Sequence, residues 1–163
     1  MSINKSDLME FLRESNVIEG IHLEPTSSDM LCVEMFLNQE SIVLNDVKAL
    51  QSSIAPGKPF RDKRGMNVRV ANHIAPAGGP DIITHMENLL LVMQVPEADP
   101  WMCHCAFEEL HPFMDGNGRT GRILWAWMML RSGKDAFALP FLHRWYYQTL
   151  SSIRVSKPIY KGA

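Results

Sequence analysis

The residues with the clearest potential for chemistry lie together in one run of twelve, residues 111–122, which reads HPFMDGNGRTGR. A histidine, His111, begins the run. An unperturbed imidazole titrates at about pH 6.5, so it can accept a proton near neutral pH. A carboxylate follows at Asp115, and two arginines, Arg119 and Arg122, lie three positions apart. Together these groups could take a proton from a hydroxyl and hold a polyphosphate.

The proline and glycines inside this run determine how the chain must be shaped around it. They interrupt any helix between the apolar segments 101–110 and 123–130. A helix must therefore restart near Asn117, and the unpaired N–H groups at its start make an anion site. The two arginines can share one face of its first turns and extend the positive field. Asp115 beside an anion site is better explained as a holder of Mg²⁺ on a phosphate.

The run closely resembles the signature of the Fic family (the Fic/Doc superfamily), His-x-Phe-x-Asp/Glu-Gly-Asn-Gly-Arg-x-x-Arg, and every fixed position is filled. The resemblance implies a protein adenylyltransferase, which moves AMP from ATP to a Ser, Thr or Tyr hydroxyl of a target protein. It implies that His111 is the general base and that Asp115 binds Mg²⁺. The positions that it assigns to ATP binding are Gly116, Asn117, Gly118, Arg119 and Arg122.

A second motif, Ser15-Asn-Val-Ile-Glu19-Gly20, resembles the inhibitory motif of the same family, Ser/Thr-x-x-x-Glu-Gly/Asn. Taken alone, it is better explained as a surface helix that ends at a glycine cap. Beside an intact signature, it predicts an N-terminal inhibitory helix over residues 6–20. The Glu19 carboxylate would then pair with Arg122, the arginine that should hold the γ-phosphate of ATP, and the enzyme would be autoinhibited.

Three alternatives to autoinhibited AMP transfer remain. The first is phosphotransfer as in the Doc branch, which has a lysine where this chain has Gly118, so the sequence favours AMP transfer. The second is deAMPylation, the removal of AMP, with Glu19 orienting a water. The third is a non-catalytic binding module on the same fold, against which the intact signature argues.

The composition is that of one ordinary globular domain over residues 1–163, with 46% hydrophobic and 21% charged residues. No apolar run approaches the roughly 18 residues that span a membrane, and the N-terminus lacks a signal-peptide pattern. We therefore expect a cytoplasmic protein without membrane contact, although export as an effector would leave no mark. The net charge of −2 argues against nucleic-acid binding. The sequence leaves a homo-oligomer open.

Five basic residues concentrate in a segment that contains a single acid, Asp62. Two interpretations carry equal weight: a solvated loop, or a positive rim that attracts ATP or an acidic target. The five are Lys58, Arg61, Lys63, Arg64 and Arg69. The three cysteines (Cys32, Cys103 and Cys105) are expected to be free thiols, because their spacing suits no complete metal site.

The pattern of apolar residues predicts an all-α fold of about seven helices with a short β-hairpin at about residues 65–76. Val68, Arg69 and Val70 form the expected first strand. In the family, a hairpin at this place is a flap that binds an extended target segment by strand addition. In the helix expected at residues 29–38, Leu31, Met35 and Phe36 should face inward. The expected helices are 6–20, 29–38, 45–53, 81–95, 99–110, 117–131 and 139–154.

Overall fold

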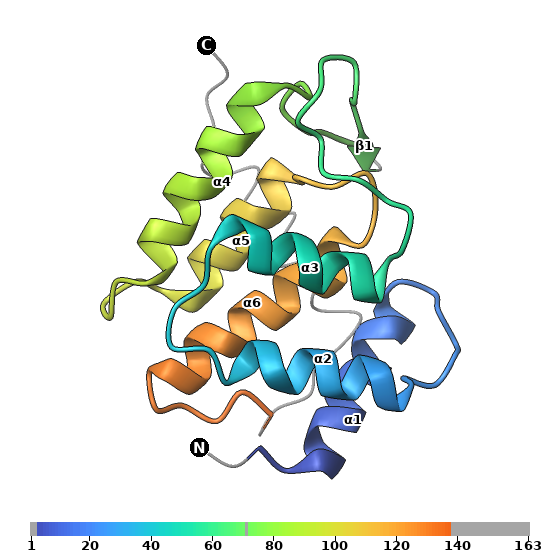
Figure 1. The fold of residues 1–163 in the computed structure, drawn as a ribbon, viewed down its shortest axis with the longest axis vertical. Helices are drawn as coiled ribbons and strands as arrows, with labels where there is room; N and C mark the ends of the chain where they lie inside the picture. The colour runs from blue at the N-terminus through green and yellow to red at the C-terminus, as the bar shows by residue number, and fades with distance from the viewer. Residues whose placement is uncertain (1–2, 71, 138–163) are drawn as a thin grey trace.

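The computed structural model describes residues 3–70 and 72–137. Six helices in these residues surround a common core, and a two-stranded hairpin lies at one end (Figure 1). The prediction of an all-α fold with a hairpin flap is thereby confirmed, and the last expected helix, 139–154, lies outside the described residues. No described helix is long and apolar enough to cross a membrane. The helices are α1 (Lys5–Ile18), α2 (Ser27–Leu37), α3 (Leu44–Ile54), α4 (Pro80–Met93), α5 (Pro100–Leu110) and α6 (Asn117–Arg131).

Helix α6 lies at the centre and contacts α1, α2, α3 and α5 (Figure 1). A helix that is apolar around its circumference has to be buried on all sides. Gly121 brings α5 and α6 into close approach, because a Cβ there would lie 2.9 Å from Phe107 Cδ1. The two helices that flank the signature turn are therefore held tightly together. The largest buried side chains of α6 are Ile123, Leu124, Trp127 and Met128.

Helix α1 begins one residue earlier than expected and ends two residues earlier. The Asn4 side chain caps it by accepting a hydrogen bond of 2.9 Å from the Ser6 N–H, so Asn4 and not Ser6 is the cap. At the other end, Gly20 has a φ of +72°, and its N–H bonds back to the Val17 carbonyl. The helix therefore ends in a left-handed glycine cap, as the sequence predicted. The predicted apolar face is buried: Leu8, Phe11 and Leu12.

The inward face predicted for α2 is wrong for two of its three residues. Leu31 and Met35 are 58% and 64% exposed, whereas Phe36 is buried as expected. The helix packs on its neighbours through Val33, Phe36 and Leu37, which follow the spacing of one helix face. Both faces of α2 carry apolar residues, so the hydrophobic pattern alone could not select the buried one.

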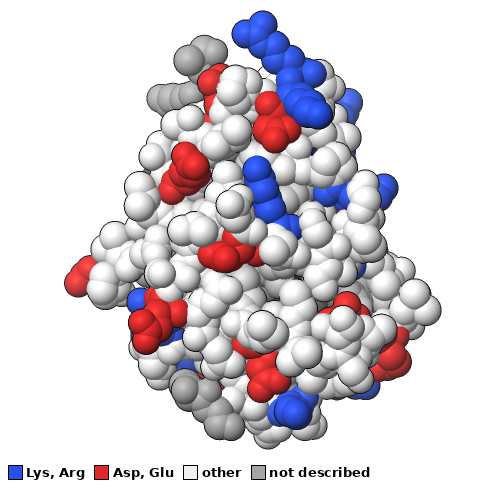
Figure 2. All heavy atoms as spheres, viewed as in Figure 1, with Lys and Arg blue, Asp and Glu red and all other residues white. Residues whose placement is uncertain are grey.

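The segment between α3 and α4 carries the hairpin. Strand β1 (Arg69–Val70) pairs antiparallel with β2 (His73–Ile74), with Arg69 opposite Ile74. The expected flap is therefore present, with strands of two residues each, but Val68 lies outside the first strand in which it was expected. Lysine and arginine side chains gather at this end of the molecule (Figure 2). Arg61 is not among the exposed ones, because it is completely buried.

Candidate active site

The signature run forms a tight turn between α5 and α6. Helix α5 ends at Leu110, and His111 adopts a left-handed conformation with φ 49° and ψ 60°. Among the described residues His111 is the only non-glycine with a positive φ. Gly116 is also left-handed, with φ 77°, and a Cβ at this position would lie 2.6 Å from the Ala55 side chain. Helix α6 then starts at Asn117, where the sequence predicted its start.

The Asn117 side chain closes this turn. Its Oδ1 accepts a hydrogen bond of 2.9 Å from the Phe113 N–H, and its Nδ2 donates one of 2.8 Å to the Phe113 carbonyl. The Gln51 side chain supports the turn from α3 by donating to the Asp115 carbonyl at 3.0 Å. Because its side chain is engaged in this way, Asn117 offers an anion only its backbone N–H.

The start of α6 has the properties of an anion site. The N–H groups of residues 117–119 have no hydrogen-bond acceptor within the described part of the chain. Unpaired N–H groups and the positive end of the helix dipole together attract phosphates. Arg119 lies beside them and donates to the Ile54 carbonyl at the end of α3. Burial lowers the pKa of Arg119, and the negative charges of Asp115 and Glu19 act in the opposite direction.

The expected ion pair between Glu19 and Arg122 is present within one chain. Arg122 Nη2 lies 2.7 Å from Glu19 Oε1. The Arg122 side chain is fully buried, and that of Glu19 is 30% exposed. Ser15 holds the same guanidinium twice, through its Oγ and its carbonyl, both at 2.8 Å. Both conspicuous residues of the second motif, Ser15 and Glu19, therefore converge on the last arginine of the signature.

The Glu19 carboxylate also lies against the backbone at the start of α6. A Cβ on Gly118 would collide with Glu19 Oε1, and it would lie 3.1 Å from Arg122 Nη1. A glycine at position 118 is therefore required for the carboxylate to reach this place. The carboxylate lies at the anion site itself.

The geometry of His111 is compatible with a proton acceptor. Its ring is partly exposed, and Nδ1 lies 3.4 Å from the Glu108 carbonyl. A carbonyl can only accept, so this contact favours the tautomer in which Nδ1 carries the proton. In that tautomer, Nε2 carries the lone pair that a general base needs. The contact is long for a hydrogen bond, so its preference is weak.

Asp115 has the properties of a magnesium ligand that works together with a phosphate. It lies exposed on the turn, and only its Oδ1 is engaged, by the Gly116 N–H at 2.7 Å. No group of three or more His, Cys, Asp or Glu residues that could hold a metal occurs in the described residues. Mg²⁺ suits such a place, because it commonly takes one or two carboxylates and completes its shell with phosphates and water.

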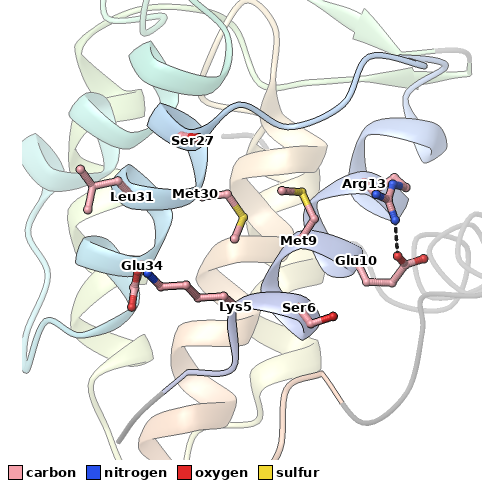
Figure 3. Close-up of a pocket in the computed structure, with 9 residues that line it drawn as sticks. All are labelled: Lys5, Ser6, Met9, Glu10, Arg13, Ser27, Met30, Leu31 and Glu34. Carbon is pink, nitrogen blue, oxygen red and sulfur yellow. Dashed lines mark hydrogen bonds and ion pairs between the residues drawn. The ribbon is translucent and has the colours of Figure 1, made fainter.

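One cavity beside the signature is small. A cavity of about 50 Å³ lies beside Arg119 and Ser15, whereas ligand sites usually measure roughly 300–1,000 Å³. A larger groove of about 650 Å³ lies between α1 and α2. Residues such as Lys5, Met9 and Met30 point into it, and no signature residue lines it (Figure 3). The larger groove is therefore distinct from the signature site.

The cysteines are free thiols, as the sequence predicted. Cys103 and Cys105 are buried in α5, and Cys32 is partly buried in α2. Burial raises the pKa of the Cys103 thiol to about 11. A thiol with such a pKa stays protonated and unreactive at neutral pH.

Sequence reasoning missed Arg61, which it grouped with the charged loop. The guanidinium donates from Nε to the His111 carbonyl at 2.7 Å and from Nη2 to the Leu110 carbonyl at 2.9 Å. Its Nη1 donates to the carbonyls of Met66 and Pro76, at 3.1 and 2.9 Å. Burial lowers its pKa. The sequence held one local sign that this position is buried, the apolar neighbour Phe60. In the structure, Phe60 pairs with Phe113 of the signature turn.

Comparisons with known proteins agree with this arrangement. The sequence model of the Fic/DOC family matches residues 31–129. The protein adenylyltransferase Fic of Aedes aegypti is 32% identical over 90 residues, which cover 52% of this chain and 18% of that protein. The solved structure of Fic-1 from C. elegans superposes with a TM-score of 0.67 at 18% identity. That match covers 94% of this chain and 57% of the other, and at this identity it shows a shared fold.

Proposed function

This chain belongs to the Fic/DOC family, and from that premise we propose that it is a protein adenylyltransferase, which moves AMP from ATP to a Ser, Thr or Tyr hydroxyl of a target protein. The observation that carries the proposal is the signature turn. Our candidate proton acceptor, His111, and our candidate anion site, the start of α6, belong to this one tight turn. The name of the Aedes aegypti relative supports the same activity. The chain spans only 18% of that relative.

The proposed reaction is a displacement at the α-phosphorus of ATP. The target hydroxyl oxygen forms a bond to that phosphorus, the bond to the bridging oxygen breaks, and pyrophosphate leaves. The hydroxyl proton passes to Nε2 of His111. Such reactions depend chiefly on alignment and on stabilisation of phosphate charge. The backbone of residues 117–119 and the guanidinium of Arg119 would provide that charge stabilisation.

Asp115 would hold Mg²⁺ in this scheme. The ion would neutralise charge on the phosphates when bound. The exposed position of this carboxylate, at the edge of the anion site, suits that role. The chain's own contribution is to fix the carboxylate through the Gly116 N–H.

We further propose that the enzyme is autoinhibited by Glu19. The carboxylate occupies Arg122 and lies against Gly118, where phosphate oxygens would have to bind. Two anions cannot share this place, because their charges repel and because the carboxylate fills the space. A charge-assisted pair with a buried arginine is strong enough to compete with a ligand. The small cavity beside Arg119 supports a closed site.

The proposed protein target would bind at the flap. β1 is exposed, and a two-stranded hairpin can accept a further strand along a free edge. Val68, Arg69 and Val70 remain our candidates for this contact. His73 ties the flap to the active-site region, because its Nε2 lies 2.9 Å from the Glu109 carbonyl. A segment added to the flap would therefore lie near the end of α5.

The test is to incubate the Glu19→Gly protein with Mg²⁺ and with ATP labelled at either the α- or the γ-phosphate. We expect α-label, and not γ-label, to become attached to protein, either to this chain or to proteins of a cell extract. The matched control is His111→Ala in the same background, which should transfer no label. Transfer of the γ-label alone would identify a Doc-like phosphotransferase.

The other two alternatives give different results. Release of AMP from a pre-modified protein, with Glu19 intact, would identify a deAMPylating enzyme. ATP binding without transfer of either label or release of AMP would identify a binding module. Any of these outcomes would contradict the proposed function.

A further inference from the structure

We infer that Arg61 is a positioning residue for the proposed reaction, which holds the His111 backbone and the target-binding flap in a fixed relation to each other. The inference starts from an unusual environment. Arg61 is completely buried, and no carboxylate within residues 3–70 and 72–137 forms an ion pair with it. A buried cation normally has an anionic partner, because the loss of its hydration is costly. Here four backbone carbonyls take the place of that partner.

The four carbonyls belong to two parts of the site. Two of them, from Leu110 and His111, lie at the end of α5. The negative end of a helix dipole stabilises a cation there. The other two, from Met66 and Pro76, lie on either side of the hairpin. One planar guanidinium, whose donors have fixed directions, therefore joins the base of the flap to the residue that carries the proposed general base.

The backbone of Arg61 adds two further contacts to the same network. Its N–H donates to the Pro112 carbonyl at 2.9 Å, directly after His111. Its carbonyl accepts from the Gly79 N–H at 3.0 Å, at the start of α4. The side chain of Arg61 thus binds the residue before the signature histidine, and its main chain binds the residue after it.

The conformation of His111 explains why such a support is needed. A non-glycine residue in the left-handed region is strained, because its Cβ lies too close to the following carbonyl oxygen. Strain of this kind persists only where the surroundings impose it. The Arg61 contacts to the carbonyls of Leu110, His111 and Pro112 impose it at three consecutive residues. Without them, the imidazole would lose its fixed direction relative to a hydroxyl presented by the flap.

This role predicts a particular kinetic pattern. The start of α6 and Arg119 make no hydrogen bond to Arg61, so ATP binding should survive its loss. Alignment between hydroxyl and base should not survive, and a misplacement of about 1 Å can lower a rate by about a hundredfold. A residue that only stabilised the fold would lower the amount of active protein and leave the rate per folded molecule unchanged.

The experiment compares Arg61→Gln and Arg61→Lys in the Glu19→Gly background. Label transfer from α-labelled ATP is measured at saturating ATP, and ATP affinity is measured by calorimetry with Mg²⁺ and a non-hydrolysable analogue. We expect Arg61→Gln to reduce the saturated rate by about a hundredfold, with affinity within about threefold of the parent. Arg61→Lys keeps the charge but cannot reach four carbonyls. Its saturated rate should therefore lie between that of the parent and that of Arg61→Gln.

The matched control is Arg131→Gln. Arg131 also donates from its guanidinium to a backbone carbonyl, that of Glu40, but it lies at the far end of α6. Loss of the Arg131 guanidinium should leave the rate of label transfer and the affinity for ATP as in the parent. Unchanged transfer per folded molecule in Arg61→Gln, or a fall in ATP affinity as large as the fall in rate, would overturn the inference. If Arg61→Gln does not fold, the same criteria apply to Arg61→Lys.

A second measurement separates this inference from the proposed function on which its activity test rests. Hydrogen exchange of backbone amides needs no activity. Loss of the Arg61 side chain should accelerate exchange at Gly79 and Met114, whose N–H groups donate to the carbonyls of Arg61 and Pro59, and leave exchange in the α6 interior unchanged. If Glu19→Gly protein transfers no label, the proposed function fails, and Arg61 is judged by exchange alone. Exchange that does not change at Gly79 and Met114 would refute the positioning role.

Discussion

Replacing Glu19 by glutamine should raise ATP affinity and at the same time lower the stability of the ligand-free protein. The substitution keeps the shape of the side chain and removes its charge. Arg122 Nη2 now contacts a carboxylate at 2.7 Å, and the guanidinium is fully buried. Its contacts to Ser15, through the hydroxyl and the carbonyl oxygen, are neutral. The substitution therefore removes an anionic contact of a buried cation.

The size of the effect follows from this contact. A hydrogen bond to a charged group contributes about 1.5–3 kcal/mol, and each 1.4 kcal/mol corresponds to about a factor of ten in affinity. ATP should therefore bind roughly ten- to a hundredfold more tightly. The Glu19 side chain is 30% exposed, which favours the lower half of this range. The free energy of unfolding of the ligand-free protein should fall by a similar amount, because the same contact is lost.

Two measurements test the expected rise in ATP affinity and the expected fall in stability. Calorimetry with Mg²⁺ and a non-hydrolysable ATP analogue gives the affinity, and chemical unfolding without nucleotide gives the stability. The matched control is Glu10→Gln on the same helix. Glu10 pairs only with the exposed Arg13, and surface pairs contribute at most about 1 kcal/mol. If Glu19→Gln gains no more affinity than Glu10→Gln, the carboxylate does not compete with nucleotide, and the proposed autoinhibition is wrong.

One further substitution tests the site, and one pH dependence tests the buried core of α5. Replacing His111 by alanine in the Glu19→Gly background should abolish transfer and leave ATP affinity within about threefold, because the imidazole serves proton removal; transfer at the parent rate would exclude it as the base. Burial raises the pKa of Cys103 from 9.0 to about 11. The folded state therefore holds this proton more tightly, and the resulting stability is present below pH 9 and lost as the pH rises toward 11. Unfolding measured from pH 8 to 11 on Cys103→Ala should show a shallower decline than the parent; an equal decline would contradict the assignment.

Local chemistry made the signature turn predictable from the sequence. The glycines at 116 and 118 force a helix to restart at Asn117, and α6 does begin there. The Glu19–Arg122 contact was expected only because a second motif resembled a known one. Nothing in the spacing of two residues so far apart in the chain could have indicated that they touch.

Other features depend on tertiary packing and escaped prediction. Leu31 and Met35 are as apolar as Val33 and Leu37, yet only the second pair faces the core. The neighbours of α2, and not its own sequence, decide which face is buried. Arg61 looks like one of several basic loop residues until the chain folds and four carbonyls surround it. A buried cation held by backbone oxygens leaves no pattern in the residue types around it.

The position of Glu19 at the very end of α1 has a consequence for how inhibition would be relieved. The helix itself is anchored by its buried face and by the contacts of Ser15 to Arg122. The carboxylate, in contrast, could leave by a rotation of one side chain, which takes nanoseconds, whereas undocking a helix is far slower. A pair worth about 1.5–3 kcal/mol would leave roughly 1–10% of molecules open at any moment. Without a regulator, the enzyme would then keep a small, constant basal activity. A regulator would only need to change how often the Glu19 side chain turns away from Arg122.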